Sequence, residues 1–183
     1  MKICIYGAGA IGGYLGAKLA AGGADVSLVA RGPHLAAMRD RGLTLITADG
    51  TTTVPVRCTD DPASLGPQDY VILTLKAHST AGVTDALRPL LGPHTAVVTA
   101  QNGILWWYFH AFPGPLAGRH LEAADPGGRI WAALGPERIL SIIREVGLAP
   151  TKAKNLWTAA NQIVDAGGEV IPDWTFLESL AGV

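Results

Sequence analysis

The stretch KICIYGAGAIGG at residues 2–13 decides the fold class. It begins with a short apolar run that ends at Gly7, which is the pattern of a buried strand. From residue 11 onward apolar side chains recur every four positions, as on one stripe of a helix, until the glycine pair 22–23 ends it. A second strand is predicted at residues 26–30. This order of strand, glycine loop, helix and strand is that of a βαβ unit with parallel strands.

The loop between the first strand and the helix has the spacing Gly-x-Gly-x-x-Gly. Its residues are Gly7, Ala8, Gly9, Ala10, Ile11 and Gly12. Gly7 allows the tight turn, Gly9 leaves the backbone open to a pyrophosphate, and Gly12 lets the helix pack close to the sheet. The free N–H groups and the positive end of the helix dipole then face the phosphates. A glycine pattern alone is weak evidence, but its position between a strand and a helix predicts a dinucleotide site at these six residues.

The residue after the second strand distinguishes between the two nicotinamide cofactors. Sites for NAD usually carry an acidic residue there, which binds the ribose 2′-hydroxyl, whereas this chain has Ala30-Arg31. A guanidinium binds a 2′-phosphate through two charge-assisted hydrogen bonds, and a carboxylate would repel it. We therefore expect NADP(H). The alternative is that Arg31 is a solvated turn residue.

Further elements follow from the same signals. They are a hairpin with arms 43–47 and 51–57 around Ala48-Asp49-Gly50, strands at 70–75 and 95–99, and a helix through Val83, Leu87 and Leu90. Lys76 and Asn102 follow two of these strands, as Gly7 and Arg31 follow the first two. Ligands of open α/β sheets bind beyond the carboxyl ends of the strands, so one site is predicted there. Taken singly, Lys76 and Asn102 also fit surface or turn positions.

The bulk composition favours a folded, soluble protein. The chain has 183 residues, is 49% hydrophobic and 16% charged, and carries a formal net charge of -1. That balance argues against disorder and against a general attraction to nucleic acid or to an anionic membrane. We expect no membrane span, because no apolar run approaches the roughly 20 residues that cross a bilayer. We also expect no metal site and no disulfide framework, since only Cys4 and Cys58 are present. The cytoplasm is the expected compartment.

Several of these motifs together resemble the cofactor domain of ketopantoate (2-dehydropantoate) reductases. The resemblance covers residues 1–139 and rests on the run that begins at Lys2, with VAR at 29–31, TLKA at 74–77 and QNG at 101–103. It implies an NADPH-dependent reductase of a small 2-keto acid, on the route to pantothenate. By this resemblance the glycine loop and Arg31 bind NADPH, while Lys76 and Asn102 border the nicotinamide and the substrate.

The same family continues into a helical domain that supplies a general acid and a substrate-binding glutamate, and neither is matched here. No catalytic residue is therefore assigned. Residues 140–183 instead predict a helical segment, and they resemble the stretch of endonuclease III-type DNA glycosylases that leads into their helix-hairpin-helix element. We hypothesise a chimera with a junction near Ile139–Leu140. A natural helical extension is the alternative.

Three functions are compatible with these patterns. The first is an NADPH-dependent 2-keto acid reductase that is incomplete. The second is a non-catalytic NADP-binding module whose helical tail docks to a partner or to a second copy. DNA binding ranks last, because acidic residues outnumber basic ones from Glu137 onward. The aromatic cluster at residues 106–109 favours buried packing over a pocket wall or a base-stacking surface.

Overall fold

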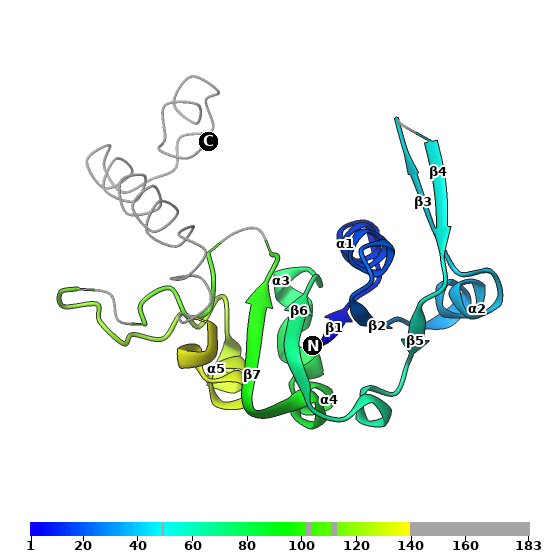
Figure 1. Cartoon of the computed structure of the whole chain (residues 1–183). Helices are drawn as coiled ribbons and strands as arrows, with labels where there is room; N and C mark the ends of the chain where they lie inside the picture. Colours follow the sequence, from blue (N-terminus) through cyan, green and yellow to red (C-terminus); the bar gives the residue numbers. More distant parts are fainter. Residues whose placement is uncertain (49, 102–103, 111–112, 140–183) are drawn as a thin grey trace, which may run out of the picture. The chain divides into compact units, whose positions relative to one another are not determined.

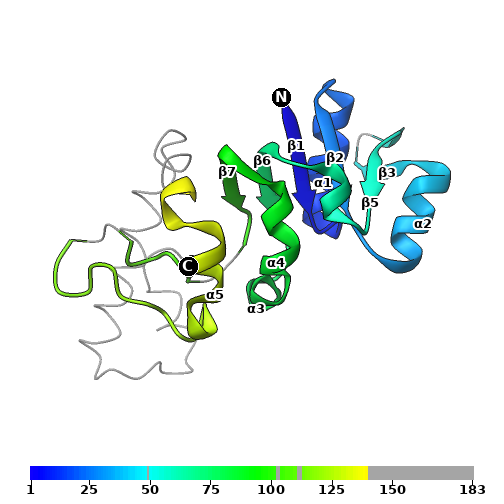
Figure 2. The same cartoon turned by 90° about the horizontal axis from the view of Figure 1, so that it is seen from below.

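A five-stranded parallel sheet forms the core of the described part of the chain (Figure 1). The computed structural model describes residues 1–48, 50–101, 104–110 and 113–139. The strands are β1 (Lys2–Tyr6), β2 (Asp25–Val29), β5 (Arg57–Thr59), β6 (Gln68–Leu73) and β7 (Leu91–Thr99). Their order in the sheet is β5-β2-β1-β6-β7, and every neighbouring pair is parallel (Figure 2).

The chain reverses its direction of travel across the sheet next to β1. It runs from β1 outward to β2 and β5, then returns to β6 on the other side of β1 and continues to β7. Tyr6 pairs with Val29 on one side and with Leu73 on the other, so these three strands end at the same level. This arrangement is the switch point at which doubly wound sheets bind ligands. The predicted Rossmann-type architecture is confirmed.

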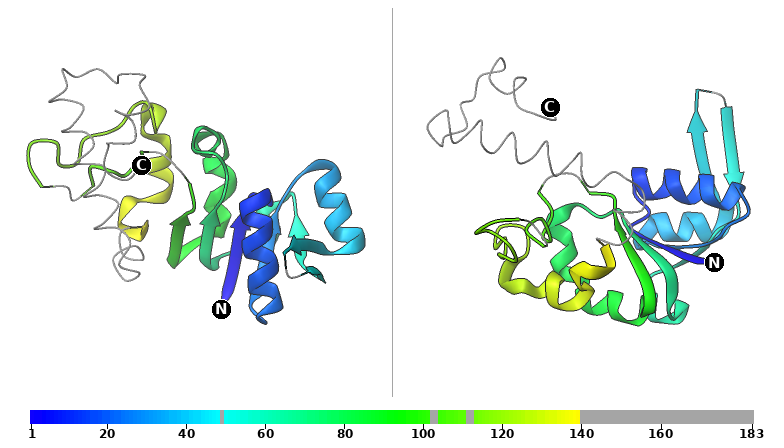
Figure 3. Two further views of the ribbon diagram at one scale, coloured as in Figure 1. Left: turned by 90° about the horizontal axis from the view of Figure 1, so that it is seen from above. Right: turned by 60° about the vertical axis from the view of Figure 1, so that its left-hand side comes forward.

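Two helices cover one face of the sheet, α1 (Ala10–Ala21) and α2 (Gly32–Arg41), as the right-hand view of Figure 3 shows. Helix α1 lies close to β2: a Cβ atom at Gly16 would be only 2.9 Å from Cδ2 of Leu28, so glycine permits this approach. On α2, Leu35 and Met38 are buried against the same core. The sequence interpretation missed α2, although Pro33 at its first turn and the three-residue spacing of Leu35 and Met38 are signals of a helix.

The other face is covered by short helical segments. They are α3 (Ala77–Thr80), α4 (Thr84–Leu87), α5 (Arg129–Leu134) and 3₁₀ turns at Pro62–Leu65, Ala81–Val83, Arg88–Leu90 and Pro126–Gly128. The single helix predicted through Val83, Leu87 and Leu90 is thus wrong in detail, although Leu87 and Leu90 are fully buried. Pro89 lacks the N–H that a continuous helix needs, and the chain changes to a 3₁₀ turn there.

The predicted hairpin is partly confirmed. Strands β3 (Leu43–Thr47) and β4 (Gly50–Val54) pair antiparallel as a separate two-stranded sheet, with Leu43 opposite Val54. The second arm does not continue to residue 57, because Pro55 ends it and residues 57–59 become β5 of the main sheet. The turn residue Asp49 lies outside the described residues.

The segment after β7 contains α5, which the sequence interpretation also missed. Trp106 is buried and its ring makes an edge contact with Trp131 of α5, with ring centroids 6.0 Å apart. The buried carboxylate of Asp125 accepts hydrogen bonds from the backbone N–H groups of Ile130 (2.7 Å) and Trp131 (2.9 Å) and so begins the helix. The aromatic cluster therefore contributes packing at Trp106, as expected.

Candidate functional site

The predicted site residues that the structure describes lie at the carboxyl edge of the sheet. The glycine loop follows β1, Arg31 follows β2 and Lys76 follows β6. The hydrogen-bond ladder continues one residue beyond the strands, since the N–H of Thr74 donates to the Tyr6 carbonyl (3.1 Å) and that of Ala100 to the Leu73 carbonyl (2.9 Å). The segments after the strand ends are therefore held next to one another. Asn102 lies outside the described residues.

The three glycines of the loop differ in the atoms that surround them. Gly7 has φ +109°, and a Cβ there would be 2.8 Å from Cδ2 of Leu75. A Cβ at Gly12 would collide with the Gly7 carbonyl oxygen and lie 2.6 Å from Oγ1 of Thr74. A Cβ at Gly9 would meet no atom within 4 Å, so the backbone at Gly9 faces open space. Two glycines thus permit close packing within the protein, and the third leaves room for a ligand.

Two side chains from other elements hold the carbonyl groups of this loop. Oγ1 of Thr74, just after β6, donates to the Gly7 carbonyl at 2.5 Å. Nε2 of His34, on α2, lies 2.7 Å from the Ala8 carbonyl oxygen. The loop is therefore fixed by side chains from two elements as well as by its own backbone.

The amino end of α1 provides the positive pole of the site. Gly9 is its N-cap, and neither a side-chain cap nor an acidic residue in the first turn neutralises the exposed N–H groups. A pocket of about 450 Å³ opens beside it, lined by loop residues 8–10, the first turn of α1, His34 and residues 43–45 of β3. Such an end of a helix suits an anionic group such as a phosphate.

Arg31 is exposed at the N-cap of α2, and within the described part of the chain no carboxylate forms an ion pair with it. Three other arginines differ in this respect, since each pairs with an aspartate. These pairs are Arg39–Asp60, Arg41–Asp40 and Arg88–Asp85. Burial raises the pKa of Tyr6, Cys4 adds to that rise, and the charge of Arg31 opposes it. The guanidinium of Arg31 is thus a cation near the strand ends and is free to receive an anion.

The ends of β6 and β7 are linked by Gln101. Its amide Nε2 donates to the Leu75 carbonyl (2.9 Å) and to Oγ1 of Thr80 (2.7 Å), so the chain after β7 is tied to the β6–α3 turn. Lys76 is the exposed N-cap residue of α3 in that turn. Lys76 therefore lies where the sequence places it, at the edge that also carries the glycine loop.

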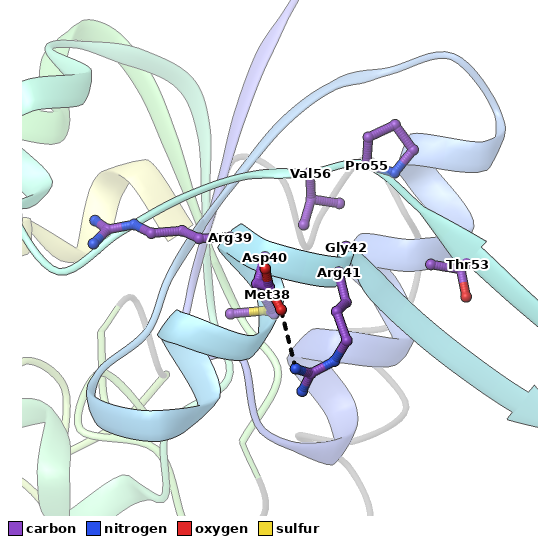
Figure 4. Close-up of a pocket in the computed structure, with 8 residues that line it drawn as sticks. All are labelled: Met38, Arg39, Asp40, Arg41, Gly42, Thr53, Pro55 and Val56. Carbon is purple, nitrogen blue, oxygen red and sulfur yellow. Dashed lines mark hydrogen bonds and ion pairs between the residues drawn. The ribbon is translucent and has the colours of Figure 1, made fainter.

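A second hollow, of about 360 Å³, lies away from this edge, between the end of α2 and the hairpin (Figure 4). Arg39 and Arg41 are among its lining residues. Their charges are paired with exposed aspartates, Arg41 with its neighbour Asp40, as the dashed line in Figure 4 marks. It lacks a free cation and a helix amino end, so it is a poorer anion site than the loop.

The sequence interpretation missed three residues that shape the site, Thr74, His34 and Gln101. Thr74 and Gln101 lie in the motifs TLKA and QNG, but their hydrogen bonds cross 67 and 26 residues, respectively, and have no local signal. His34 was missed with α2 itself. Among the described residues no group of three or more histidine, cysteine or acidic side chains could hold a metal ion. The same part of the chain contains no helix that is long and apolar enough to cross a membrane.

Taken together, the parallel sheet, the open glycine loop and the helix amino end define an α/β domain of the Rossmann type, a class in which dinucleotides bind at this edge of the sheet. Comparison with protein families then identifies the particular group. The family model described as ketopantoate reductase PanE/ApbA matches residues 3–105, and the chain belongs to this family.

The names of similar proteins are consistent with this family assignment. The chain is 56% identical over 144 residues to the 2-dehydropantoate 2-reductase of Mesorhizobium japonicum, an alignment that covers 78% of this chain and 44% of that protein. A crystal structure assigned as a ketopantoate reductase, from Ralstonia solanacearum MolK2, superposes with a TM-score of 0.71 at 48% identity, covering 75% of this chain and 43% of that one. The chain thus spans less than half the length of these two relatives.

One more distant structure contains a nicotinamide cofactor. It is a D-mandelate dehydrogenase in complex with NADH and anilino(oxo)acetate, at 26% identity and a TM-score of 0.53, covering 57% of this chain and 34% of that one. The expected resemblance of residues 140–183 to DNA glycosylases receives no support from these comparisons. It concerns residues outside the described part of the chain and stays a prediction, as does the chimera.

Proposed function

We propose that this chain binds NADP(H) at the carboxyl edge of its sheet and contributes to the reduction of a small 2-keto acid. By similarity to its relatives, this acid is 2-dehydropantoate. One observation carries the proposal: the open backbone at Gly9, the uncapped end of α1 and Arg31, which forms no ion pair within the described residues, lie at the same edge. The first two suit a pyrophosphate, and Arg31 suits the 2′-phosphate that distinguishes NADP from NAD.

The described residues support binding better than they support turnover. NADPH supplies the hydride, and the oxygen of the reduced carbonyl then needs a proton from a general acid. Lys76 and Asn102 are proposed to border that reaction, by family resemblance, but neither is assigned as the acid. We therefore expect little or no turnover of ketopantoate by these 183 residues alone. Robust consumption of NADPH would contradict this expectation.

Cofactor preference tests the proposal most directly. Titration of the full chain with NADPH and with NADH, followed by nicotinamide fluorescence, should show tighter binding of NADPH. Arg31→Ala should remove most of this preference, because it removes the only charge assigned to the 2′-phosphate. Arg88→Ala is the matched control, since Arg88 is an exposed arginine paired with Asp85. Equal affinity of the unaltered chain for both cofactors would refute the role of Arg31.

Gly9→Ala separates binding from folding. The added Cβ would meet nothing within 4 Å and Gly9 has φ -71°, so the variant should fold, with at most about 1 kcal/mol of stability lost because alanine is a poorer N-cap residue than glycine. The same methyl group would occupy the space through which a pyrophosphate approaches, so the affinity for both cofactors should fall at least about tenfold. If the variant binds NADPH as the unaltered chain does, the pyrophosphate lies elsewhere.

A non-catalytic NADP-binding module is the second candidate that the sequence patterns leave open. Both candidates predict cofactor binding. They differ in whether ketopantoate accelerates NADPH oxidation, which an absorbance assay at saturating cofactor measures. Cytoplasmic location, division of the chain at residue 139 and docking through the helical tail are further predictions of the sequence.

A further inference from the structure

His34 is a side chain next to the phosphate-binding loop for which neither the motifs nor the comparisons give a role. It lies on the first turn of α2, three residues after Arg31. Its ring is exposed overall, yet Nε2 is 2.7 Å from the carbonyl oxygen of Ala8, which is 26 positions earlier in the chain. Packing alone does not explain this contact, because the neighbouring Leu35 fills the core beneath α2.

The chemistry of this contact determines which ring nitrogen carries the proton. A carbonyl oxygen only accepts hydrogen bonds, so Nε2 must carry the hydrogen and act as the donor. Neutral histidine in that tautomer leaves Nδ1 without a proton, whereas protonated histidine keeps the same bond. The hydrogen bond to Ala8 therefore forms in both charge states.

The bond orients one peptide group of the loop at which the cofactor is proposed to bind. A trans peptide is planar, and its N–H points opposite to its C=O. Fixing the Ala8 carbonyl toward His34 thus fixes the Gly9 N–H in the opposite direction. Thr74 does the same for the preceding peptide, because its Oγ1 donates to the Gly7 carbonyl and so orients the N–H of Ala8. Two consecutive peptide groups are held by side chains from two other elements.

We propose that His34 is a positioning residue that preorganises the peptide groups of the glycine loop for the pyrophosphate. This inference rests on the proposed binding of NADP(H) at the loop. A donor that is already oriented loses less freedom when a ligand arrives, and the affinity is correspondingly higher. The pyrophosphate is common to NADPH and NADH, so His34 acts equally on both, whereas Arg31 acts on the 2′-phosphate of NADPH alone.

The variants His34→Ala, His34→Gln and, as control, His94→Ala test this role in the full chain. His94 is an exposed histidine near the start of β7, at the opposite end of that strand from the site. His34→Ala should weaken NADPH and NADH by the same factor, about five- to tenfold, because one hydrogen bond is lost. His34→Gln retains an N–H donor and should recover most of the affinity. His94→Ala should change neither affinity.

A second measurement reads the loop without cofactor. In ¹⁵N-labelled protein the Gly9 amide signal should shift in His34→Ala, while it stays in place in His94→Ala. Unchanged affinities and an unchanged Gly9 signal in His34→Ala would overturn the inference. A selective loss of NADPH affinity would also overturn it, because His34 would then contact the 2′-phosphate. If the unaltered chain binds neither cofactor, the proposed function itself fails.

Discussion

Replacement of Gly12 by alanine tests how closely α1 approaches the loop and β6. The structure places a Cβ at this position against the Gly7 carbonyl and 2.6 Å from Oγ1 of Thr74, closer than real Cβ contacts. The helix must move, and the hydrogen bond from Thr74 to Gly7 must lengthen or break. Gly13→Ala is the matched control on the same helix, because its Cβ would lie 3.8 Å from its nearest neighbours, in ordinary contact.

The expected magnitudes follow from opposing effects. Overpacking costs about 1–3 kcal/mol and loss of one hydrogen bond about 1 kcal/mol, while alanine gains about 1 kcal/mol over glycine within a helix. Gly12→Ala should therefore lower the free energy of unfolding by about 1–3 kcal/mol. Gly13→Ala, which gains helix propensity without a clash, should raise it by up to about 1 kcal/mol.

Urea unfolding followed by far-ultraviolet circular dichroism measures both variants against the unaltered chain. The two free energies of unfolding should differ by about 1–4 kcal/mol, with Gly12→Ala the less stable variant. Equal stability of the two variants would refute the close approach of α1 to the loop. It would also remove the reason for a glycine at position 12.

The remaining predictions concern the two thiols and a buried carboxylate. A thiol reagent at pH 8 should label the half-buried Cys58 in the native protein and Cys4 only after unfolding, because Cys4 is fully buried and burial raises its pKa to about 12. The unfolded Cys4 thiol ionises near its ordinary pKa of 9.0 while the folded one stays protonated, so the free energy of unfolding should fall as the pH rises from 9 toward 12. Cys4→Ala should make this fall with pH less steep. An equally steep fall in both proteins would contradict the prediction. Asp125→Ala should lower the free energy of unfolding by about 2 kcal/mol by removing the acceptor of two backbone N–H groups at α5, with partial recovery in Asp125→Asn, and thermal melts that match the unaltered chain would refute it.

Much of the fold was predictable because its signals are local. The strand at β1, the glycine loop and α1 are adjacent in the chain, so the change of apolar spacing and the glycines suffice to recognise them. The ends of β2, β6 and β7 were likewise recognised from short apolar runs. Because parallel strands end at one edge, this was enough to place Arg31 and Lys76 near the loop.

The failures have physical reasons of two kinds. Helices α2 and α5 are short, have weak periodicity and were not predicted. The apolar spacing through Val83, Leu87 and Leu90 predicted one continuous helix, which Pro89 interrupts. Strand β5 was not predicted, and its first residue, Arg57, was placed in the hairpin, because nothing in residues 57–59 themselves indicates that they pair with β2. Pairing partners are chosen by packing across the sheet, which local spacing does not report.

By itself, the sequence determined the class of fold and led to the proposal of NADP(H) as the ligand, because glycine spacing and an arginine in place of an acid act through neighbouring residues. Only the tertiary structure decided how the loop is held. Thr74 and His34 reach Gly7 and Ala8 from 67 and 26 positions away, and no local pattern encodes such contacts. Their hydrogen bonds exist because the sheet order and the packing of α2 bring distant segments together.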